Sequence, residues 1–219
     1  MKIAVLGTGM VGHAIAKGLL ASGHHVRMGS RSAANEKALE FAGSHENAGG
    51  GTFADAAAFG ELAFNCTAGA HTRAALELAG AERLAGKVLI DVANPLDFSA
   101  GMPPGLTVCN DDSLGEQVQR WLPQTHVVKA LNTMNCDIMV NPASVPGDHV
   151  VFICGNSAQA KTVASRLLVD DFGWRPSQCI DLGGIEQARG TEMFLPLWLR
   201  IYGAVGHVNF NIALPGAHS

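Results

Sequence analysis

Residues 1–12 have the sequence MKIAVLGTGMVG, and this stretch decides the fold. Residues 3–6 form a short apolar run, which is typical of a strand in a parallel sheet that helices cover on both faces. Glycines follow at positions 7, 9 and 12 in the pattern GxGxxG, and apolar side chains then recur every four residues from Val11 to Leu19. The stretch therefore predicts a strand, a tight turn and a helix, the arrangement that binds the pyrophosphate of a dinucleotide.

Each glycine has a separate task in this interpretation. Gly7 permits the tight turn, Gly9 lets the backbone approach a pyrophosphate, and Gly12 lets the helix pack closely against the strand. The anion then lies against free N–H groups at the positive end of the helix. Gly23 stands where a glycine commonly ends such a helix.

The alternation of short apolar runs and helical stretches continues along the chain. Further strands are expected at residues 26–28, 62–66, 88–92, 127–131, 150–154 and 179–182, with a weak one near 52–53. Helices are expected at residues 72–79, 114–121 and 158–172, the second of them opened by a capping box of Ser113 and Glu116. The glycines at 49–51 are interpreted as a loop. This order predicts an α/β fold with a doubly wound, Rossmann-type, mostly parallel sheet.

The composition excludes several classes of protein. The chain has 219 residues, 47% hydrophobic and 16% charged, so it can bury a core without disulfides or metals. Its 15 basic and 19 acidic residues give a net charge of −4, which leaves no basic footprint for nucleic acid or an anionic membrane. The five cysteines form no CxxC pair, and no apolar stretch fits a membrane span. We therefore expect a soluble, cytoplasmic protein with reduced thiols.

The end of the second expected strand distinguishes between the two nicotinamide dinucleotides. An NAD enzyme places Asp or Glu there, which accepts hydrogen bonds from the ribose 2′-hydroxyl. This chain has Gly29-Ser30-Arg31-Ser32, and the nearest acidic residue, Glu36, falls inside the next helix. Arg31 offers a planar set of donors that matches a phosphate, and no carboxylate stands beside it to repel one. We therefore expect NADP(H) rather than NAD(H), the alternative being that Arg31 is a solvated surface charge.

A search for a general acid or base finds no clear candidate. Tyr202 is the only tyrosine and has no lysine four residues later, which excludes a Tyr-x-x-x-Lys mechanism. Lys129 precedes Asn132 at a spacing one residue short of the Lys/Asn pair of hydroxyacid dehydrogenases, so we expect a structural or surface role for it. His71 fits a solvated loop, and His207 falls in the expected tail helix. No grouping has metal-ligand spacing, so we assign no catalytic residue and no metal ligand.

The tail after Glu186 is helix-like and apolar nearly all the way round. A helix on a sheet needs only one apolar stripe. The apolar residues of this tail are Met193, Phe194, Leu195, Leu197, Trp198, Leu199, Ile201 and Tyr202. We therefore expect a second surface to cover it, either the partner in a homodimer or a bound planar cofactor.

Several of these stretches together resemble NADPH-dependent reductases of the deazaflavin coenzyme F420 and their bacterial homologues of unassigned substrate. The resemblance covers nearly the whole chain, from MKIAVLGTG at 1–9 and the Gly29-Ser30-Arg31 stretch to VVKALNTM at 127–134, VFICG at 151–155 and LPLWL at 195–199. The dinucleotide-binding domains of six-transmembrane metalloreductases look similar over the same segments.

The resemblance implies a set of site residues. The pyrophosphate would be held by Thr8, Gly9, Met10 and Val11, and the 2′-phosphate by Ser30 and Arg31. The nicotinamide side would be lined by Thr67, Asn94 and Cys136, each just beyond the carboxyl end of a strand. The acceptor ring would face Met134, Asn135 and the tail around Pro196. Independently of the resemblance, the place of His207 in the expected tail helix makes us expect it to face the substrate or the partner.

These inferences describe one NADP-binding Rossmann domain over residues 1–219, with the sheet and crossover helices at 1–184 and a helical tail at 185–219. The tail would complete the acceptor cleft and provide the dimer contact. The leading hypothesis is an oxidoreductase that transfers hydride between nicotinamide C4 and a deazaflavin (coenzyme F420) or flavin-like ring, because two cofactors then supply the chemistry. The alternatives are a reductase of a small carbonyl or imine, with His71 or His207 as proton donor, and a non-catalytic NADP(H)-sensing module.

Overall fold

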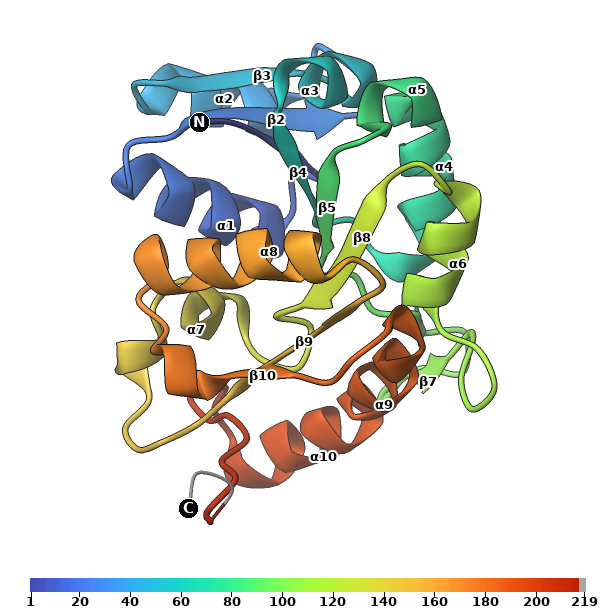
Figure 1. Ribbon diagram of the computed structural model, residues 1–219, viewed down its shortest axis with the longest axis vertical. Helices are drawn as coiled ribbons and strands as arrows, with labels where there is room; N and C mark the ends of the chain where they lie inside the picture. Colours follow the sequence, from blue (N-terminus) through green and yellow to red (C-terminus); the bar gives the residue numbers. More distant parts are fainter. Residues whose placement is uncertain (217–219) are drawn as a thin grey trace.

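An eight-stranded sheet forms the centre of the protein (Figure 1). The computed structural model describes residues 1–216, and the strand order is β10-β9-β8-β5-β4-β1-β2-β3. The strands are β1 Lys2–Leu6, β2 His25–Ser30, β3 Ala48–Thr52, β4 Leu62–Asn65, β5 Val88–Asp91, β8 His126–Ala130, β9 Val151–Gly155 and β10 Cys179–Asp181. Neighbouring strands are parallel except β8 and β9, which are antiparallel. The predicted doubly wound, mostly parallel, Rossmann-type sheet is confirmed.

Helices cover both faces of this sheet and divide the core into two clusters. The first face carries α1 Met10–Ala21, α2 Glu36–Ser44, α7 Cys136–Val140 and α8 Ala158–Asp170. The second carries α3 Phe53–Phe59, α4 Gly69–Ala79, α5 Ala81–Leu84 and α6 Leu114–Trp121. Along β1, Ile3 and Val5 enter the first cluster while Ala4 and Leu6 enter the second. This burial on both faces explains why the strands are uninterrupted apolar runs.

The glycine stretch at 49–51 is a strand, so its interpretation as a loop was wrong. It forms most of β3, whereas the weak strand expected near 52–53 ends at Thr52, and Phe53 begins α3. An added Cβ at Gly50 would lie 3.0 Å from the carbonyl oxygen of Ala38 in α2, and one at Gly51 would lie 2.9 Å from Cβ of Asp55 in α3. The flanking helices therefore approach β3 too closely for ordinary side chains, and the missing apolar pattern hid the strand.

The capping box expected before α6 is half present. The backbone N–H of Glu116 donates to the hydroxyl of Ser113 at 3.1 Å, which caps the helix. The carboxylate of Glu116 accepts from the same hydroxyl at 2.8 Å and from Arg189, not from the backbone N–H of the cap residue. Its side chain therefore joins α6 to the tail instead of closing the box.

The expected helical tail consists of α9 Ala188–Met193 and α10 Leu195–Val205, at the end of the molecule opposite β2 and β3 (Figure 1). Helix α10 stops at Gly206, whose φ of +80° is the left-handed conformation of a helix C-cap. His207 therefore follows the helix in an exposed turn, and its expected place inside the helix was wrong. Residues 217–219 of the expected tail lie outside the described residues.

Short elements complete the connections. The strands β6 Leu96–Asp97 and β7 Gly105–Leu106 form a separate antiparallel pair after β5. Three 3₁₀ turns lie at Pro142–Ser144, Pro176–Gln178 and Ile185–Gln187.

Candidate functional site

The glycine-rich turn between β1 and α1 has the geometry that its sequence predicts. Gly7 has φ +123°, and an added Cβ there would lie 2.7 Å from the carbonyl oxygen of Cys66. At Gly12 a Cβ would lie 2.3 Å from the carbonyl oxygen of Gly7, so the helix packs against the turn without room for a side chain. Gly9 is exposed, and a Cβ there would meet no atom within 4 Å. The backbone at Gly9 is therefore open to a ligand, as the motif requires.

Ser30 ends β2 beside this turn and Arg31 follows it, and the two side chains differ in whether they are free to bind a ligand. The hydroxyl of Ser30 is buried and donates to the carbonyl oxygen of Ser32 at 2.6 Å, so it shapes the loop. The Arg31 side chain is exposed and, among the described residues, has no ion-pair or hydrogen-bond partner. Its five N–H donors are therefore free for an anion.

Two adjoining cavities run along the carboxyl ends of the central strands. The first, of about 270 Å³, lies beside the glycine turn and is lined by Gly7, Thr8, Gly9, Arg31, Phe53, Cys66, Thr67, Ala68, His71, Ala74, Ala75 and Leu78. The second, of about 290 Å³, is lined by Val11, Cys66, Thr67, Ala68, Gly69, Ala70, His71, Val92, Ala93, Asn94, Leu96 and Phe98. They share four residues from Cys66 to His71 and so form one groove across the point where the strand order reverses, the usual ligand site of such sheets.

Thr67 and Asn94 line the second cavity, and neighbouring amides hold both side chains. The Thr67 hydroxyl donates to Oδ1 of Asn65 at 2.7 Å. Nδ2 of Asn94 donates to the carbonyl oxygen of Asn132 at 2.8 Å, and Nδ2 of Asn132 donates back to Oδ1 of Asn94 at 2.9 Å. Leu131, just before Asn132, has φ +66°, a conformation that side chains rarely adopt and that is common at functional sites. The polar wall of this cavity is therefore preorganised.

Few titratable side chains face the groove. They are Arg31, Cys66 and His71 among the residues lining the two cavities. Burial, assisted by the nearby Asp91 carboxylate, raises the pKa of the Cys66 thiol far above its usual range, so the thiol stays neutral. His71 lies in the first turn of α4, where the sequence favoured a solvated loop. Its exposed imidazole borders both cavities, and His71 is the only histidine among their lining residues, which include no carboxylate.

The other predicted residues lie outside the linings of these two cavities. Cys136 is the first residue of α7, half-buried, and burial raises its pKa. Asn135 caps the same helix by accepting from the N–H of Asp137 at 2.9 Å, and Met134 is buried. Pro196 lies in the first turn of α10.

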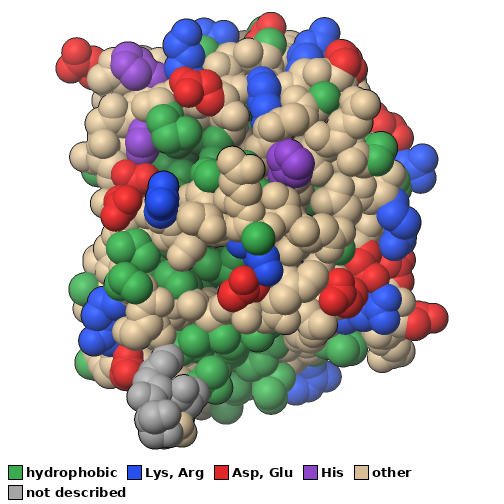
Figure 2. Space-filling model, in the orientation of Figure 1, with side chains coloured by type: hydrophobic (Ala, Val, Ile, Leu, Met, Phe, Trp, Pro, Cys, Tyr) green, Lys and Arg blue, Asp and Glu red, His purple; other side chains and the backbone are tan. Residues whose placement is uncertain are grey.

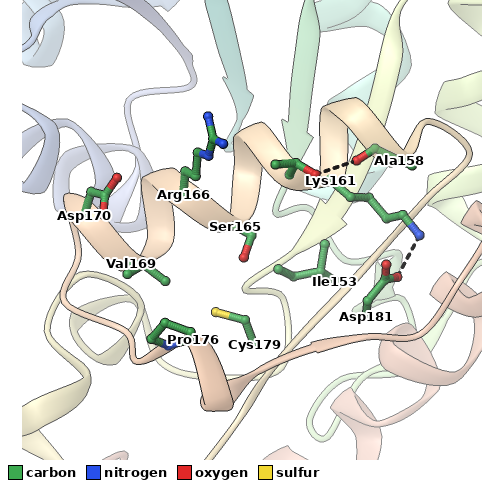
Figure 3. Close-up of a pocket in the computed structure, with 11 residues that line it drawn as sticks. Ile153, Ala158, Lys161, Ser165, Arg166, Val169, Asp170, Pro176, Cys179 and Asp181 are labelled. Carbon is green, nitrogen blue, oxygen red and sulfur yellow. Dashed lines mark hydrogen bonds and ion pairs between the residues drawn. The ribbon is translucent and has the colours of Figure 1, made fainter.

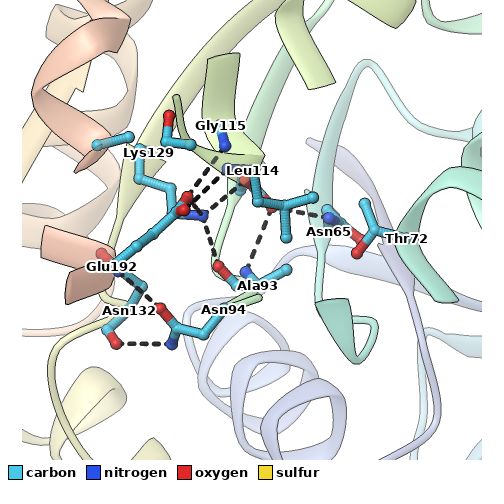
Figure 4. Close-up of polar contacts among 12 residues, drawn as sticks. Asn65, Thr72, Ala93, Asn94, Leu114, Gly115, Lys129, Asn132 and Glu192 are labelled. Atoms are coloured by element: carbon cyan, nitrogen blue, oxygen red, sulfur yellow. Dashed lines mark hydrogen bonds and ion pairs between the residues drawn. The ribbon is translucent and has the colours of Figure 1, made fainter. Parts of the chain in front are cut away.

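A buried ionic cluster, which the sequence did not reveal, lies behind the groove (Figure 4). It consists of Lys129 in β8, Asp91 at the end of β5 and Glu192 in α9, all buried. The expected surface role of Lys129 was wrong, whereas the structural role expected as its alternative is correct. Burial alone lowers the pKa of Lys129, but Asp91 and Glu192 outweigh that effect and raise it, so the ammonium stays charged. A lysine inside the apolar run VVKAL was the available signal, since such a charge requires a buried counter-charge.

A separate groove of about 450 Å³ lies between α8 and β10 (Figure 3). Lys161 donates there to Asp181 at 2.7 Å and to the carbonyl oxygen of Gly183 at 3.0 Å. Figure 3 shows the Ser165 hydroxyl pointing toward the Cys179 thiol. This groove shares no lining residue with the two cavities of the candidate site.

The tail leaves an apolar surface, as its sequence predicts. Hydrophobic side chains gather at the end of the molecule that α10 occupies (Figure 2), and the exposed ones of the tail are Met193, Leu197, Tyr202 and Val205. Within residues 1–216, no helix has the length and apolar character needed to cross a bilayer.

The Rossmann-type sheet with its glycine turn has the architecture of dinucleotide-binding proteins, and the comparisons identify the chain as an NADP-dependent oxidoreductase. Residues 2–95 match the family described as NADP oxidoreductase, coenzyme F420-dependent. A crystal structure from Arthrobacter sp. FB24, provisionally assigned as an F420-dependent NADP reductase, is 50% identical, with a TM-score of 0.92 over 98% of this chain and 99% of that one. The chain belongs to this family, the F420-dependent NADP oxidoreductases.

Two more distant relatives bear on the fold. The metalloreductase STEAP3 of Rattus norvegicus is 30% identical over 203 residues, which are 90% of this chain and 38% of that protein. The present chain thus spans well under half the length of that relative. An imine reductase from Myxococcus stipitatus in complex with NADP⁺ is 16% identical, with a TM-score of 0.62 over 94% of this chain and 64% of that one. At that identity the likeness concerns the fold alone.

Proposed function

We propose that the groove binds NADP(H) with its phosphates at the glycine turn and its nicotinamide in the second cavity. The residues fit the group: the open backbone at Gly9 would receive the pyrophosphate, with Thr8, Met10 and Val11 around it. Arg31 would hold the 2′-phosphate, and the buried Ser30 would shape the loop that presents it. Thr67 and Asn94 would orient the nicotinamide, with Cys136 on the same side as a less direct neighbour.

We further propose that the acceptor is a second redox ring, a deazaflavin such as coenzyme F420 or a flavin. When bound, the nicotinamide supplies or receives a hydride at C4. The observation that carries this proposal is that His71 is the only side chain lining the second cavity that is left to donate a proton: the Thr67 hydroxyl and the Asn94 amide are already hydrogen-bonded, and the Cys66 thiol has a raised pKa. Hydride transfer between two rings needs stacking and orientation from the protein and no strong acid.

The acceptor ring would lie on the side of the tail. Met134 and Asn135 precede α7, and Pro196 lies in the first turn of α10, so these residues come from the two segments that would border such a ring. His207 lies in an exposed turn beyond α10, so in this proposal it contacts the outer edge of the ring or a partner subunit.

A reduction assay tests the acceptor. The full-length protein is mixed with NADPH and, in separate reactions, with coenzyme F420, FMN, and a panel of small aldehydes, ketones and imines, while the absorbance at 340 nm is followed. We expect the absorbance to fall with a ring acceptor and to stay constant with the carbonyl and imine panel. Turnover of the panel alone refutes the ring acceptor, and tight NADPH binding without any turnover supports the sensing module instead.

His71 favours one second candidate, a reductase of a small carbonyl or imine. Its imidazole borders the second cavity and has no side-chain partner among the described residues, so it could donate a proton there. The variant His71→Ala separates the two functions. Ring reduction should stay within about two-fold of the wild-type rate, whereas carbonyl reduction that depends on this proton should fall by about 10²-fold or more.

We also propose a cytoplasmic homodimer formed through the tail of a single domain. The exposed apolar side chains of α9 and α10 support the dimer, and the five free cysteines support a reducing compartment. Light scattering at micromolar concentration should give twice the mass of the chain, and a monomeric mass contradicts the dimer.

A further inference from the structure

Lys129 has every donor of its ammonium engaged inside the protein. Its Nζ lies 2.9 Å from Oδ2 of Asp91 and 2.7 Å from Oε1 of Glu192, and it donates to the carbonyl oxygen of Ala93. The side chains of the three ionic residues are at most 1% exposed. Three donors thus meet three acceptors, two at the end of β5 and one in α9, which ties β8 to both of these segments.

Glu192 connects this ammonium to the tail. It belongs to α9, and its two oxygens accept from the N–H groups of Leu114 at 2.8 Å and Gly115 at 2.9 Å in the first turn of α6. The cluster places two carboxyl groups around one ammonium, and Glu192 accepts at the positive end of α6. Helix α9 is therefore held by hydrogen bonds that solvent does not reach.

Asp91 and Ala93 connect the same ammonium to the second cavity. Oδ1 of Asp91 accepts from Nδ2 of Asn65 at 2.7 Å, and Asn65 in turn accepts from the Thr67 hydroxyl at 2.7 Å. The carbonyl of Ala93, which accepts from Lys129, directly precedes Asn94 (Figure 4). Both residues line the second cavity. Thr67 and Asn94 are therefore each tied to Lys129 by a short chain of hydrogen and peptide bonds.

We propose that Lys129 is a positioning residue: one buried ammonium sets the wall of the nicotinamide cavity and the tail helix α9 in fixed relation. The inference rests on the proposed function, because that function assigns the nicotinamide to the second cavity. The link to the phosphate side is weaker: Thr67 also lines the first cavity, but Arg31 and the glycine turn form no hydrogen bond or ion pair with the three residues of the cluster. Loss of the ammonium therefore affects the two halves of the dinucleotide differently, which a general loss of stability does not.

Calorimetry with two ligands tests this difference. Adenosine 2′,5′-bisphosphate carries the 2′-phosphate and one 5′-phosphate but no nicotinamide, whereas NADPH carries both halves. In Lys129→Met we expect the affinity for NADPH to fall about ten-fold, while the affinity for the bisphosphate stays within about two-fold of the wild type. Thermal unfolding is recorded in parallel, so that binding is compared only at temperatures where the variant is folded.

Two further variants keep the test decisive. Glu192→Gln retains the pair of Lys129 and Asp91 and is expected to lower the NADPH affinity about three-fold, so it decides the matter if Lys129→Met does not fold. Lys161→Met removes another lysine ion pair, with Asp181 beside β10, and should change neither affinity.

The proposal is overturned if the folded variants bind NADPH as the wild type does, or if the affinities for both ligands fall in parallel. A wild type that binds neither ligand instead refutes the proposed dinucleotide site. A wild type that binds both, with variants that bind both equally well, refutes only the role of Lys129.

Discussion

The two halves of the proposed dinucleotide site are built in different ways. The phosphate side comes from the first 31 residues, depends on glycine backbone, and ends in an arginine that is exposed and unpaired among the described residues. The nicotinamide side is assembled from β4, β5, β8 and α9, and its Lys129 and Asp91 lie 38 residues apart in the sequence. The first half exposes free N–H groups to an anion, whereas the polar side chains of the second half are already hydrogen-bonded to one another. A substitution on the phosphate side should therefore mainly weaken ligand binding, whereas a substitution in the buried cluster should mainly lower the free energy of unfolding.

The largest effect is expected from the buried side. Lys129→Met leaves Asp91 and Glu192 buried together without their cation, and removal of one partner of a buried pair costs about 3–5 kcal/mol. Urea unfolding of the wild type and the variant measures this loss in the free energy of unfolding. The matched control is Lys161→Met, whose partner Asp181 is 57% exposed, and it should cost about 1 kcal/mol or less. Equal losses in the free energy of unfolding would show that the buried pair of Lys129 contributes no more to stability than the exposed pair of Lys161.

The exposed side should give the reverse result. Arg31→Ala removes the charged donor for the 2′-phosphate, and hydrogen bonds to charged groups are worth about 1.5–3 kcal/mol, or roughly 10- to 150-fold in affinity. We expect calorimetry to show that loss for NADPH, little change for NADH, and an unchanged melting temperature. An equal loss for both dinucleotides contradicts the assignment of Arg31 to the 2′-phosphate.

The same contrast explains what the sequence could predict. The strands, the glycine turn and Arg31 follow from local patterns, because the residues that act together lie close together in the chain. The stretch from Gly49 to Gly51 was wrongly predicted as a loop. Glycines are needed there because helices pack closely on the strand, and that packing is not visible in the local sequence. Lys129 was noticed only for its spacing to Asn132, yet its counter-charges come from β5 and α9.

Two asparagines that support the proposed site could not be identified from sequence spacing. Asn65 and Asn132 were not assigned to the site, although they hold Thr67 and Asn94 in place. An amide that supports another side chain has no signature in one sequence, since its partner is known only once the strands are paired. The residues predicted to touch a ligand thus have a signal in the sequence, whereas the residues that orient them do not.

Within the glycine turn, two alanine substitutions sharpen the comparison. Gly12→Ala places a Cβ 2.3 Å from the carbonyl oxygen of Gly7, and such overpacking costs about 1–3 kcal/mol. Gly9→Ala meets no protein atom within 4 Å, so the melting temperature should stay unchanged while NADPH binding weakens. Differential scanning calorimetry and titration of both variants check the pair. Similar melting temperatures for the two would mean that Gly12 does not serve close packing.

The smallest effect is expected from the exposed ion pair between Asp112, just before α6, and Arg120 in α6. It lies close in sequence to Glu116, which pairs with Arg189. Asp112 lies 2.7 Å from Arg120, and this hydrogen bond lowers the pKa of Asp112 to about 2. A lowered pKa in the folded state stabilises the protein above the ordinary aspartate range, near pH 4, and this contribution is lost as the pH falls toward about 2. Because Arg120 is 57% exposed, the loss should be about 1 kcal/mol or less.

Urea unfolding of the wild type and Asp112→Asn measures this contribution. The difference between their free energies of unfolding should be constant near neutral pH and shrink as the pH falls through the range from about 4 to about 2. A difference that stays constant over that range would show that the pair contributes nothing through its charge. The expected size also completes the comparison, because an ion pair that water reaches contributes less than the buried cluster of Lys129. When one partner is removed, water solvates the charge that remains at the surface, whereas a buried carboxylate is left without its cation and without water.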